Sequence, residues 1–333
     1  MSIPFVHKTC RFPRSLLSGL EKPSAQYKQR QMRILFITAT RLGDAVISTG
    51  LLDHLIRTYP HARFTIACGP VAAGLFQNVP GLDRVITMDK RKYDLHWLDL
   101  WKACVAQKWD LTIDLRGSAV TALLRSSRRV IMRGGRRPGL RLAHVAQTLS
   151  LSPPPVPTVW LDPSDVACAT TLLPTTGTPL IALGPTANWS GKIWPVERYL
   201  PLWHRLQSAY PTARPVILYG PGQQERDLAA PVLAALPQAI DAGGRFSLTE
   251  VAAILRKCQL YVGNDSGLMH LAAAAGTPTL GLFGPSRASE YAPSGAHTAW
   301  VAAPGPEGDA AIADLSVSTV AEAALRLLAE TSS

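Results

Sequence analysis

Short apolar runs that end in a glycine turn and are followed by helical spacing recur along this chain, and they constrain its fold most. The first unit begins near Met32, with Ile34-Leu35-Phe36-Ile37, a glycine turn and then helically spaced apolar residues from Ala45 to Ile56. Further apolar runs follow at residues 64–68, 84–88 and 111–115. Strands that alternate with helices form parallel sheets with helices on both faces. The sequence therefore predicts an α/β domain that begins near Met32.

A proline-dense segment, Ser152-Pro153-Pro154-Pro155-Val156-Pro157, interrupts this pattern and predicts the start of a stiff linker. Behind it the pattern resumes, with apolar runs at 180–183, 216–219, 260–262 and 279–283. For 333 residues, two domains are expected. We predict an N-terminal domain at 32–155, a C-terminal domain at 156–317 and a final helix at 318–333 that packs back on the first domain. Two such units should face each other across a cleft, with ligands at the carboxyl ends of the strands.

The composition excludes two classes of protein. Hydrophobic residues make up 47% of the chain and charged residues 17%, which argues against a disordered chain. No apolar run approaches the ~20 residues that a membrane span needs. The formal net charge of +11 indicates anionic partners.

The basic residues gather in two segments. Residues 1–31 hold six basic side chains and one acidic side chain, and we expect either a disordered basic tail or a mis-called start before Met32. Residues 115–150 hold no acidic residue. This second segment predicts a local positive field, or else a solvated helix face. Its arginines are Arg116, Arg125, Arg128, Arg129, Arg133, Arg136, Arg137 and Arg141.

The cysteines and histidines predict no metal site. The five cysteines are scattered and never spaced C-x-x-C, which is typical of reduced, buried thiols in a cytosolic protein. The histidines lack the H-x-x-x-H pairing, and no Asp-x-Asp pair is present to hold a divalent ion on a diphosphate.

The first loop that carries chemistry is Thr40-Arg41-Leu42-Gly43-Asp44, between a predicted strand and a predicted helix. Its single glycine does not form a dinucleotide fingerprint, so a nicotinamide dehydrogenase is disfavoured. Asp44 has two interpretations. It is either the N-cap of the helix or a carboxylate at the floor of the cleft, ready to accept a proton.

The second loop is Asn188-Trp189-Ser190-Gly191-Lys192-Ile193-Trp194-Pro195. A lysine just ahead of a helix, in a loop after a strand, is well placed to hold phosphate oxygens. The alternative is an ordinary exposed lysine.

The third loop is Gly263-Asn264-Asp265-Ser266-Gly267-Leu268-Met269-His270. It opens a helix whose free backbone N–H groups form an anion site. Taken alone, Asp265 and Ser266 could equally cap that helix, and His270 could be a satisfied core histidine.

Together, and in this order, the three loops resemble glycosyltransferase family 9, the ADP-heptose:lipopolysaccharide heptosyltransferases of Gram-negative bacteria. The resemblance runs from about Met32 to Leu328, and its strongest element is the third loop. It implies a GT-B fold, in which two Rossmann-like domains face each other. It also implies an inverting, metal-independent transfer without a cofactor, from a nucleotide sugar bound by the C-terminal domain.

The resemblance also implies roles for single residues. Asp44 would be the general base, and Lys192 would offset the charge of the leaving nucleotide. Donor binding would fall to Asn188, Glu225, Asn264, Asp265, Ser266, Gly267 and His270. An acceptor bearing Kdo carboxylates and phosphates, such as Kdo-lipid A or the inner core, would suit Arg41, Arg116, Arg133, Arg136 and Arg137.

The chain departs from this pattern at Ala187-Asn188, where some lipopolysaccharide heptosyltransferases carry two threonines. The donor is therefore expected, but not fixed, to be ADP-heptose, and a transferase of another cell-surface glycan stays open. A sugar-nucleotide epimerase is a further alternative. Nucleic-acid binding is disfavoured because no matching motif accompanies the basic charge. The expected location is the cytoplasm, peripheral to the cytoplasmic face of the inner membrane.

Overall fold

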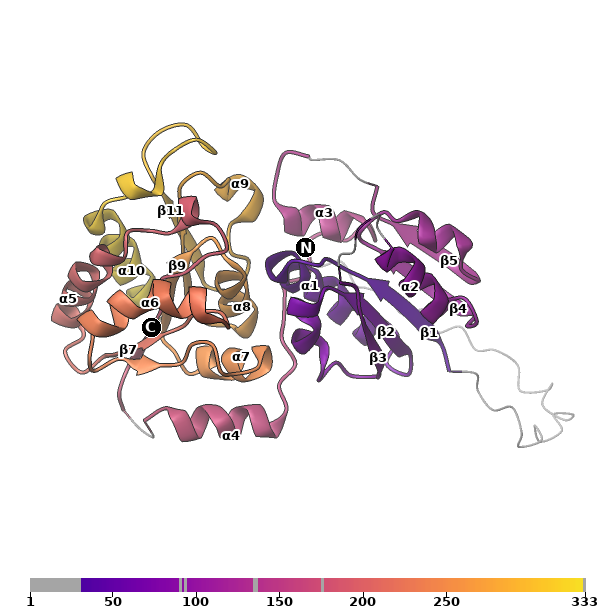
Figure 1. Ribbon diagram of the computed structural model, residues 1–333, viewed down its shortest axis with the longest axis horizontal. Helices are drawn as coiled ribbons and strands as arrows, with labels where there is room; N and C mark the ends of the chain where they lie inside the picture. Colours follow the sequence, from indigo (N-terminus) through magenta and orange to yellow (C-terminus); the bar gives the residue numbers. More distant parts are fainter. Residues whose placement is uncertain (1–30, 90–91, 93–94, 134–136, 175–176, 332–333) are drawn as a thin grey trace, which may run out of the picture. The chain divides into compact units, whose positions relative to one another are not determined.

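The computed structural model of the chain describes residues 31–89, 92, 95–133, 137–174 and 177–331, which fold into two parallel-sheet α/β domains (Figure 1). The predicted pair of Rossmann-like domains is therefore confirmed. The predicted tail, apart from Gln31, lies outside the described residues. Among the helices of these ranges, none has the length and apolar character needed to cross a membrane.

The first domain is built on a five-stranded sheet with strand order β3-β2-β1-β4-β5. Its central strand is buried on both sides, because Ile34 and Phe36 join the core on one face and Leu35 and Ile37 join it on the other. The strands are β1 (Arg33–Ile37), β2 (Arg63–Cys68), β3 (Leu82–Thr87), β4 (Trp109–Asp114) and β5 (Ser126–Ile131).

Helices cover both faces of this sheet. Side chains of α1, η1 and α3 pack in the core with Phe36, and side chains of α2 and η3 pack in the core with Ile37. These helices are α1 (Leu42–Thr58), η1 (Pro70–Phe76), α2 (His96–Cys104), η3 (Ala119–Leu123) and α3 (Arg141–Gln147).

The second domain is built on a six-stranded sheet with strand order β11-β10-β9-β6-β7-β8. As in the first sheet, the strand order reverses beside the first strand of the domain, here between β6 and β9. Ligands of open α/β sheets bind at such a reversal. The strands are β6 (Leu180–Gly184), β7 (Arg214–Ile217), β8 (Ile240–Asp241), β9 (Leu260–Asn264), β10 (Thr279–Phe283) and β11 (Thr298–Ala302).

The helices of the second domain also form two layers. One core unites the sheet with α5, α6 and α10, and the other unites it with α4, α7 and α8. These elements are α4 (Pro163–Leu172), α5 (Tyr199–Ala209), α6 (Gln223–Ala235), α7 (Leu248–Arg256), α8 (Gly267–Ala275), α9 (Ala288–Tyr291) and α10 (Val317–Thr331), with short turns η4 (Ser190–Lys192), η5 (Val196–Arg198) and η6 (Ile312–Asp314).

Helices α1 and α8 pack against each other and join the cores of the two domains. Two glycines permit this approach. A Cβ atom on Gly43 would lie 2.9 Å from Cδ2 of His270, and one on Gly267 would lie 2.8 Å from the side chain of Leu42. The packing therefore brings the N-terminal ends of both helices, and the loops that precede them, to one place.

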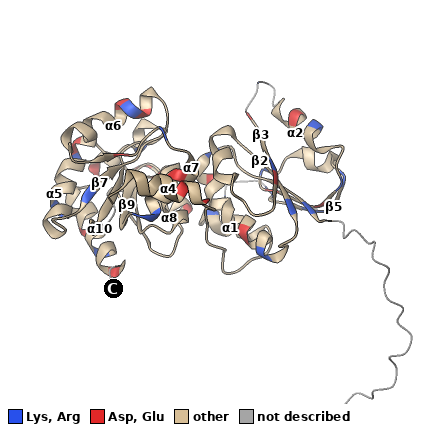
Figure 2. Cartoon of the chain, turned by 90° about the horizontal axis from the view of Figure 1, so that it is seen from below, with Lys and Arg blue, Asp and Glu red and all other residues tan. Residues whose placement is uncertain are grey.

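Two sequence-based expectations differ from the structure. The C-terminal helix was expected on the first domain, and this is wrong. Helix α10 packs on α5 and strands β9–β11, because its apolar stripe (Val320, Ala324, Leu327) is buried in the core of the second domain. Strand β5 was not expected. It is an edge strand with an exposed arginine pair, so it lacks the apolar run that marked the other strands (Figure 2).

Candidate functional site

A cavity of about 1020 Å³ is lined by both domains. The first domain contributes the loop after β1 and the start of α3, and the second contributes loops after β6, β7, β9 and β10. These loops follow the carboxyl ends of parallel strands. The structure thus unites the three loops singled out in the sequence. Of the expected site residues, those that line this cavity are Arg41, Asp44, Arg137, Asn188, Lys192, Glu225, Asp265, Ser266, Gly267 and His270.

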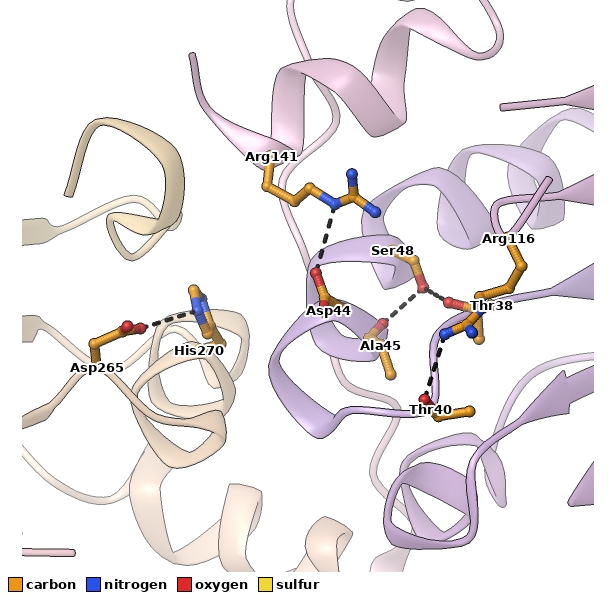
Figure 3. A network of polar contacts seen from close by, with 9 residues as sticks. All are labelled: Thr38, Thr40, Asp44, Ala45, Ser48, Arg116, Arg141, Asp265 and His270. Carbon is orange, nitrogen blue, oxygen red and sulfur yellow. Dashed lines mark hydrogen bonds and ion pairs between the residues drawn. The ribbon is translucent and has the colours of Figure 1, made fainter. Parts of the chain in front are cut away.

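Asp44 is the third residue of α1, and its side chain is 23% exposed. The N-cap residue is Arg41, whose side chain makes no capping hydrogen bond, so the interpretation of Asp44 as the N-cap is wrong. Oδ1 of Asp44 instead lies 3.5 Å from Nε of Arg141, as Figure 3 shows. A carboxylate in the first turn also interacts favourably with the helix dipole. Asp44 therefore presents an ion-paired carboxylate to the cavity.

Lys192 ends the short turn η4, and its Nζ lies 2.5 Å from Oδ2 of Asp265. Asp265 is almost fully buried, whereas a quarter of the Lys192 side chain is exposed. The residues that begin α8 line the same wall of the cavity. The ammonium group of Lys192 therefore lies on the same wall as the positive N-terminal end of α8. A lysine beside a helix N-terminus is an arrangement that binds phosphate groups.

Asn264 was expected to bind the donor, but the structure does not place it in the lining of the cavity. Its side chain is fully buried. Its Oδ1 accepts a hydrogen bond of 3.0 Å from the backbone N of Trp194, and its Nδ2 donates to the carbonyl of Gly184 at 3.5 Å. The Trp194 indole is itself buried and donates to the carbonyl of Leu315. Asn264 therefore holds in position the loop that carries Lys192.

His270 borders the cavity from α8 while only 5% of the residue is exposed. Its Nε2 lies 4.0 Å from Oδ1 of Asp265 (Figure 3). Burial lowers the pKa of His270, and this effect exceeds the opposing influence of the carboxylates of Asp265 and Asp44. The imidazole is therefore neutral near pH 7.

A second, smaller cavity of about 260 Å³ adjoins the first, because both are lined by Asp44, Arg137, Arg141 and His144. Arg116 and Arg133 line only the smaller one of the two. Thr38 and Ser48 also line it, with their hydroxyl oxygens 2.7 Å apart (Figure 3). This smaller cavity, which we call the side cavity, is therefore strongly basic and has hydroxyl groups in its wall.

Arg116 is held at the side cavity by the turn that follows β4. The buried carboxylate of Asp114 accepts hydrogen bonds from the backbone N of Arg116, at 2.8 Å, and of Gly117 and Ser118. Gly117 has a φ of 64°, which favours glycine. The Arg116 guanidinium then donates to Oγ1 of Thr40 at 3.3 Å.

The arginine-rich segment divides into two parts. Arg125, Arg128 and Arg129 lie on or beside β5, and Arg129 donates to the carbonyls of Thr121 and Leu124. Arg133, Arg137 and Arg141 follow β5 and line the cavities. The segment is therefore an edge strand and a cavity wall, not a helix face. Arg136 lies outside the described residues.

Several cavity residues had no role in the sequence-based site. Arg141 and His144 belong to α3, whose packing on α1 was not predictable from spacing. Ser286 and Arg287 directly follow Gly284-Pro285, the same kind of strand-ending turn that marked the other loops. Oγ of Ser286 is buried and has no hydrogen-bond partner within the described ranges. Their position in a loop after a strand was the signal from which the sequence could have indicated Ser286 and Arg287.

No group of three or more His, Cys, Asp or Glu side chains that could hold a metal ion occurs in the part of the chain that the structure describes. The charged groups that line the cavity include Asp44 and Lys192, beside the N-terminal end of α8. The arrangement offers a proton acceptor on one domain and an anion site on the other. It suits the transfer of a group from a phosphate ester to a hydroxyl.

The family model described as glycosyltransferase family 9 (heptosyltransferase) matches residues 141–308. The lipopolysaccharide heptosyltransferase 2 of Salmonella typhimurium is 33% identical over 129 residues, which cover 37% of this chain and 36% of the relative. This match thus spans little more than a third of that relative's length. The lipooligosaccharide heptosyltransferase 2 of Haemophilus ducreyi is 24% identical over 303 residues, which cover 79% of this chain and 86% of the relative.

The fold is shared with a solved structure. The ADP-heptose lipopolysaccharide heptosyltransferase II of E. coli superimposes with a TM-score of 0.72 at 20% identity. The superposition covers 91% of this chain and 100% of that one. The similarity extends through both domains and shows that the two proteins share a fold.

Proposed function

The chain belongs to glycosyltransferase family 9, and from this membership we propose that it is a heptosyltransferase of lipopolysaccharide core assembly. The donor is ADP-heptose, and the acceptor is an anionic glycolipid such as Kdo-lipid A or the inner core. The relatives of Salmonella typhimurium and Haemophilus ducreyi, and the E. coli ADP-heptose enzyme of the same fold, support this choice.

One observation carries the proposal: Asp44 of the first domain and Lys192 of the second line the same cavity. Asp44 takes the proton from an acceptor hydroxyl, whose oxygen attacks the anomeric carbon of the donor sugar. The new glycosidic bond forms as the bond from that carbon to the diphosphate oxygen breaks, and the nucleoside diphosphate leaves with the electron pair. Attack opposite the leaving group inverts the anomeric configuration.

The leaving diphosphate gains negative charge as it departs. Lys192 and the backbone N–H groups at the start of α8 stabilise this charge, an electrostatic role like that of an oxyanion hole. Asp265, which contacts Lys192, is positioned to bind sugar hydroxyls. Glu225 accepts a hydrogen bond from Gly220 at 3.1 Å and borders the cavity, where it is available to the nucleoside.

The basic side cavity supports an anionic acceptor. Arg116, Arg133 and Arg137 line it, and Asp44 lies where it meets the larger cavity. Guanidinium groups bind carboxylate and phosphate in a bidentate manner. The same positive charge favours an anionic membrane surface, which supports a peripheral location at the cytoplasmic face of the inner membrane.

Mass spectrometry of lipopolysaccharide from a strain that lacks this gene tests the proposal. We expect a core truncated by one heptose, and complementation by the intact gene should restore it. An unchanged core would contradict the proposal. A loss confined to another cell-surface glycan would assign the enzyme to that glycan instead.

Assays with purified protein test the mechanism. Transfer should continue in EDTA, and Lys192→Ala should impair donor use more than acceptor use, whereas the exposed Lys257→Ala should have no effect. Loss of activity in EDTA that Mg²⁺ restores would contradict metal independence. Turnover of the nucleotide sugar without any acceptor would favour the epimerase alternative.

A further inference from the structure

We propose that Arg141 is the positioning residue of Asp44: its guanidinium holds Oδ1 and thereby leaves Oδ2 to receive the acceptor proton. This inference rests on the proposed function, because it requires Asp44 to be the base. It assigns to Arg141 a task different from that of the arginines that bind the acceptor.

The contact joins two helices of the first domain. Nε of Arg141, the first residue of α3, lies 3.5 Å from Oδ1 of Asp44, and both side chains are only partly exposed. Helix α3 packs against α1, with Val145 in the shared core, so the two backbones are fixed relative to each other. Figure 3 shows the Asp44 carboxylate turned toward the Arg141 guanidinium, and an ion pair between two fixed helices favours this orientation.

Arg141 is poorly suited to its own helix. A cation in the first turn opposes the helix dipole. The first turn of α3 contains no acidic residue, and the N-cap residue Leu140 provides no capping side chain. The stability of α3 therefore does not explain an arginine at this position, whereas the contact with Asp44 does.

The neighbouring arginines make different contacts. Arg137 lines the same two cavities, but its Nη2 donates to the carbonyl of Arg133 at 3.4 Å. Arg116 donates to Thr40. Arg137 is therefore the matched control, because its replacement removes the same charge from the same cavities without releasing Asp44.

The test compares Arg141→Gln, Arg141→Lys and Arg137→Gln in the purified transfer assay. Because loss of orientation at a reacting group costs up to about 10²-fold, Arg141→Gln should lower kcat at least about tenfold. Arg141→Lys should recover part of the loss. Arg137→Gln should raise the acceptor KM and leave kcat within about twofold. The melting temperature of Arg141→Gln should equal or exceed that of the wild type.

A double-mutant cycle with Asp44→Asn separates the possible outcomes. If Arg141 acts through Asp44, Arg141→Gln should cause no further loss of kcat in the Asp44→Asn background. The same fold-loss in both backgrounds, or an effect of Arg141→Gln on the acceptor KM alone, would overturn the positioning role. Full activity of Asp44→Asn would instead overturn the proposed mechanism, and this inference with it.

Discussion

At the scale of single residues, His270 makes the stability of this protein depend on pH. Burial lowers its pKa below the ordinary value of 6.5, so the unfolded chain binds a proton that the folded chain does not. The contribution of neutral His270 to the stability of the folded state is complete above about pH 6.5. This stability is lost as the pH falls toward the lowered pKa of the folded state. Urea unfolding at pH 7.5 and 5.5 should therefore show a larger loss of stability in the wild type than in His270→Gln. Equal losses in the two proteins would contradict this assignment.

Other residues at this scale show what a sequence can and cannot reveal. Lys192 and Asp265 were singled out because they stand between a strand and a helix, and Asp44 because it lies in the first turn of the helix that follows such a loop. Asn264 is the last residue of β9, beside such a loop, and its amide oxygen accepts a hydrogen bond from the backbone N of Trp194, 70 residues away. The partner of a polar side chain depends on tertiary packing, so sequence position alone could not indicate this contact of Asn264.

At the scale of elements, the contact between α1 and α8 depends on two glycines. Alanine at Gly43 would press on the buried His270 ring, and alanine at Gly267 would press on Leu42. The Gly43→Ala/Gly267→Ala variant should lose about 1–3 kcal/mol of stability, as overpacked cores do. Thermal unfolding measures the loss, with Gly74→Ala as control, because its Cβ would meet only Leu248 at 3.9 Å. Equal melting of the double variant and the control would show that the helices can separate without cost.

The elements were predictable where burial dictated their pattern. The strands buried on both faces, such as β1 and β10, appear in the sequence as continuous apolar runs. The edge strand β5 does not, because half-exposed edge strands tolerate arginine. The amphipathic pattern of α10 correctly indicated a helix. It could not indicate which domain buries the apolar stripe, because that depends on tertiary packing.

At the scale of the whole molecule, a buried carboxylate links the two domains at a second point. Oδ2 of Asp165, in α4, accepts a hydrogen bond of 2.8 Å from Asn78 of the first domain, and Oδ1 accepts one of 2.8 Å from Thr249 of the second. Asn78→Ala should cost about 1.5–3 kcal/mol, the range for hydrogen bonds to charged groups. Gln77→Ala, at the exposed neighbouring residue, should cost nothing measurable in the same unfolding experiment. Equal stability of the two variants would show that the hydrogen bond between Asn78 and Asp165 does not stabilise the protein.

The central claim is that both domains act on one transfer, with Asp44 as the base, and a single assay with purified protein tests it. ADP-heptose and a Kdo-lipid A acceptor are incubated with wild type, Asp44→Asn or Asp44→Ala, and the acceptor is analysed by mass spectrometry. The wild type should add one heptose, and both variants should be slower by about 10²–10⁴-fold, the usual effect of removing a general base. Both should melt near the wild-type temperature, because Asp44 does not cap α1. Transfer by Asp44→Asn at the wild-type rate would contradict the claim.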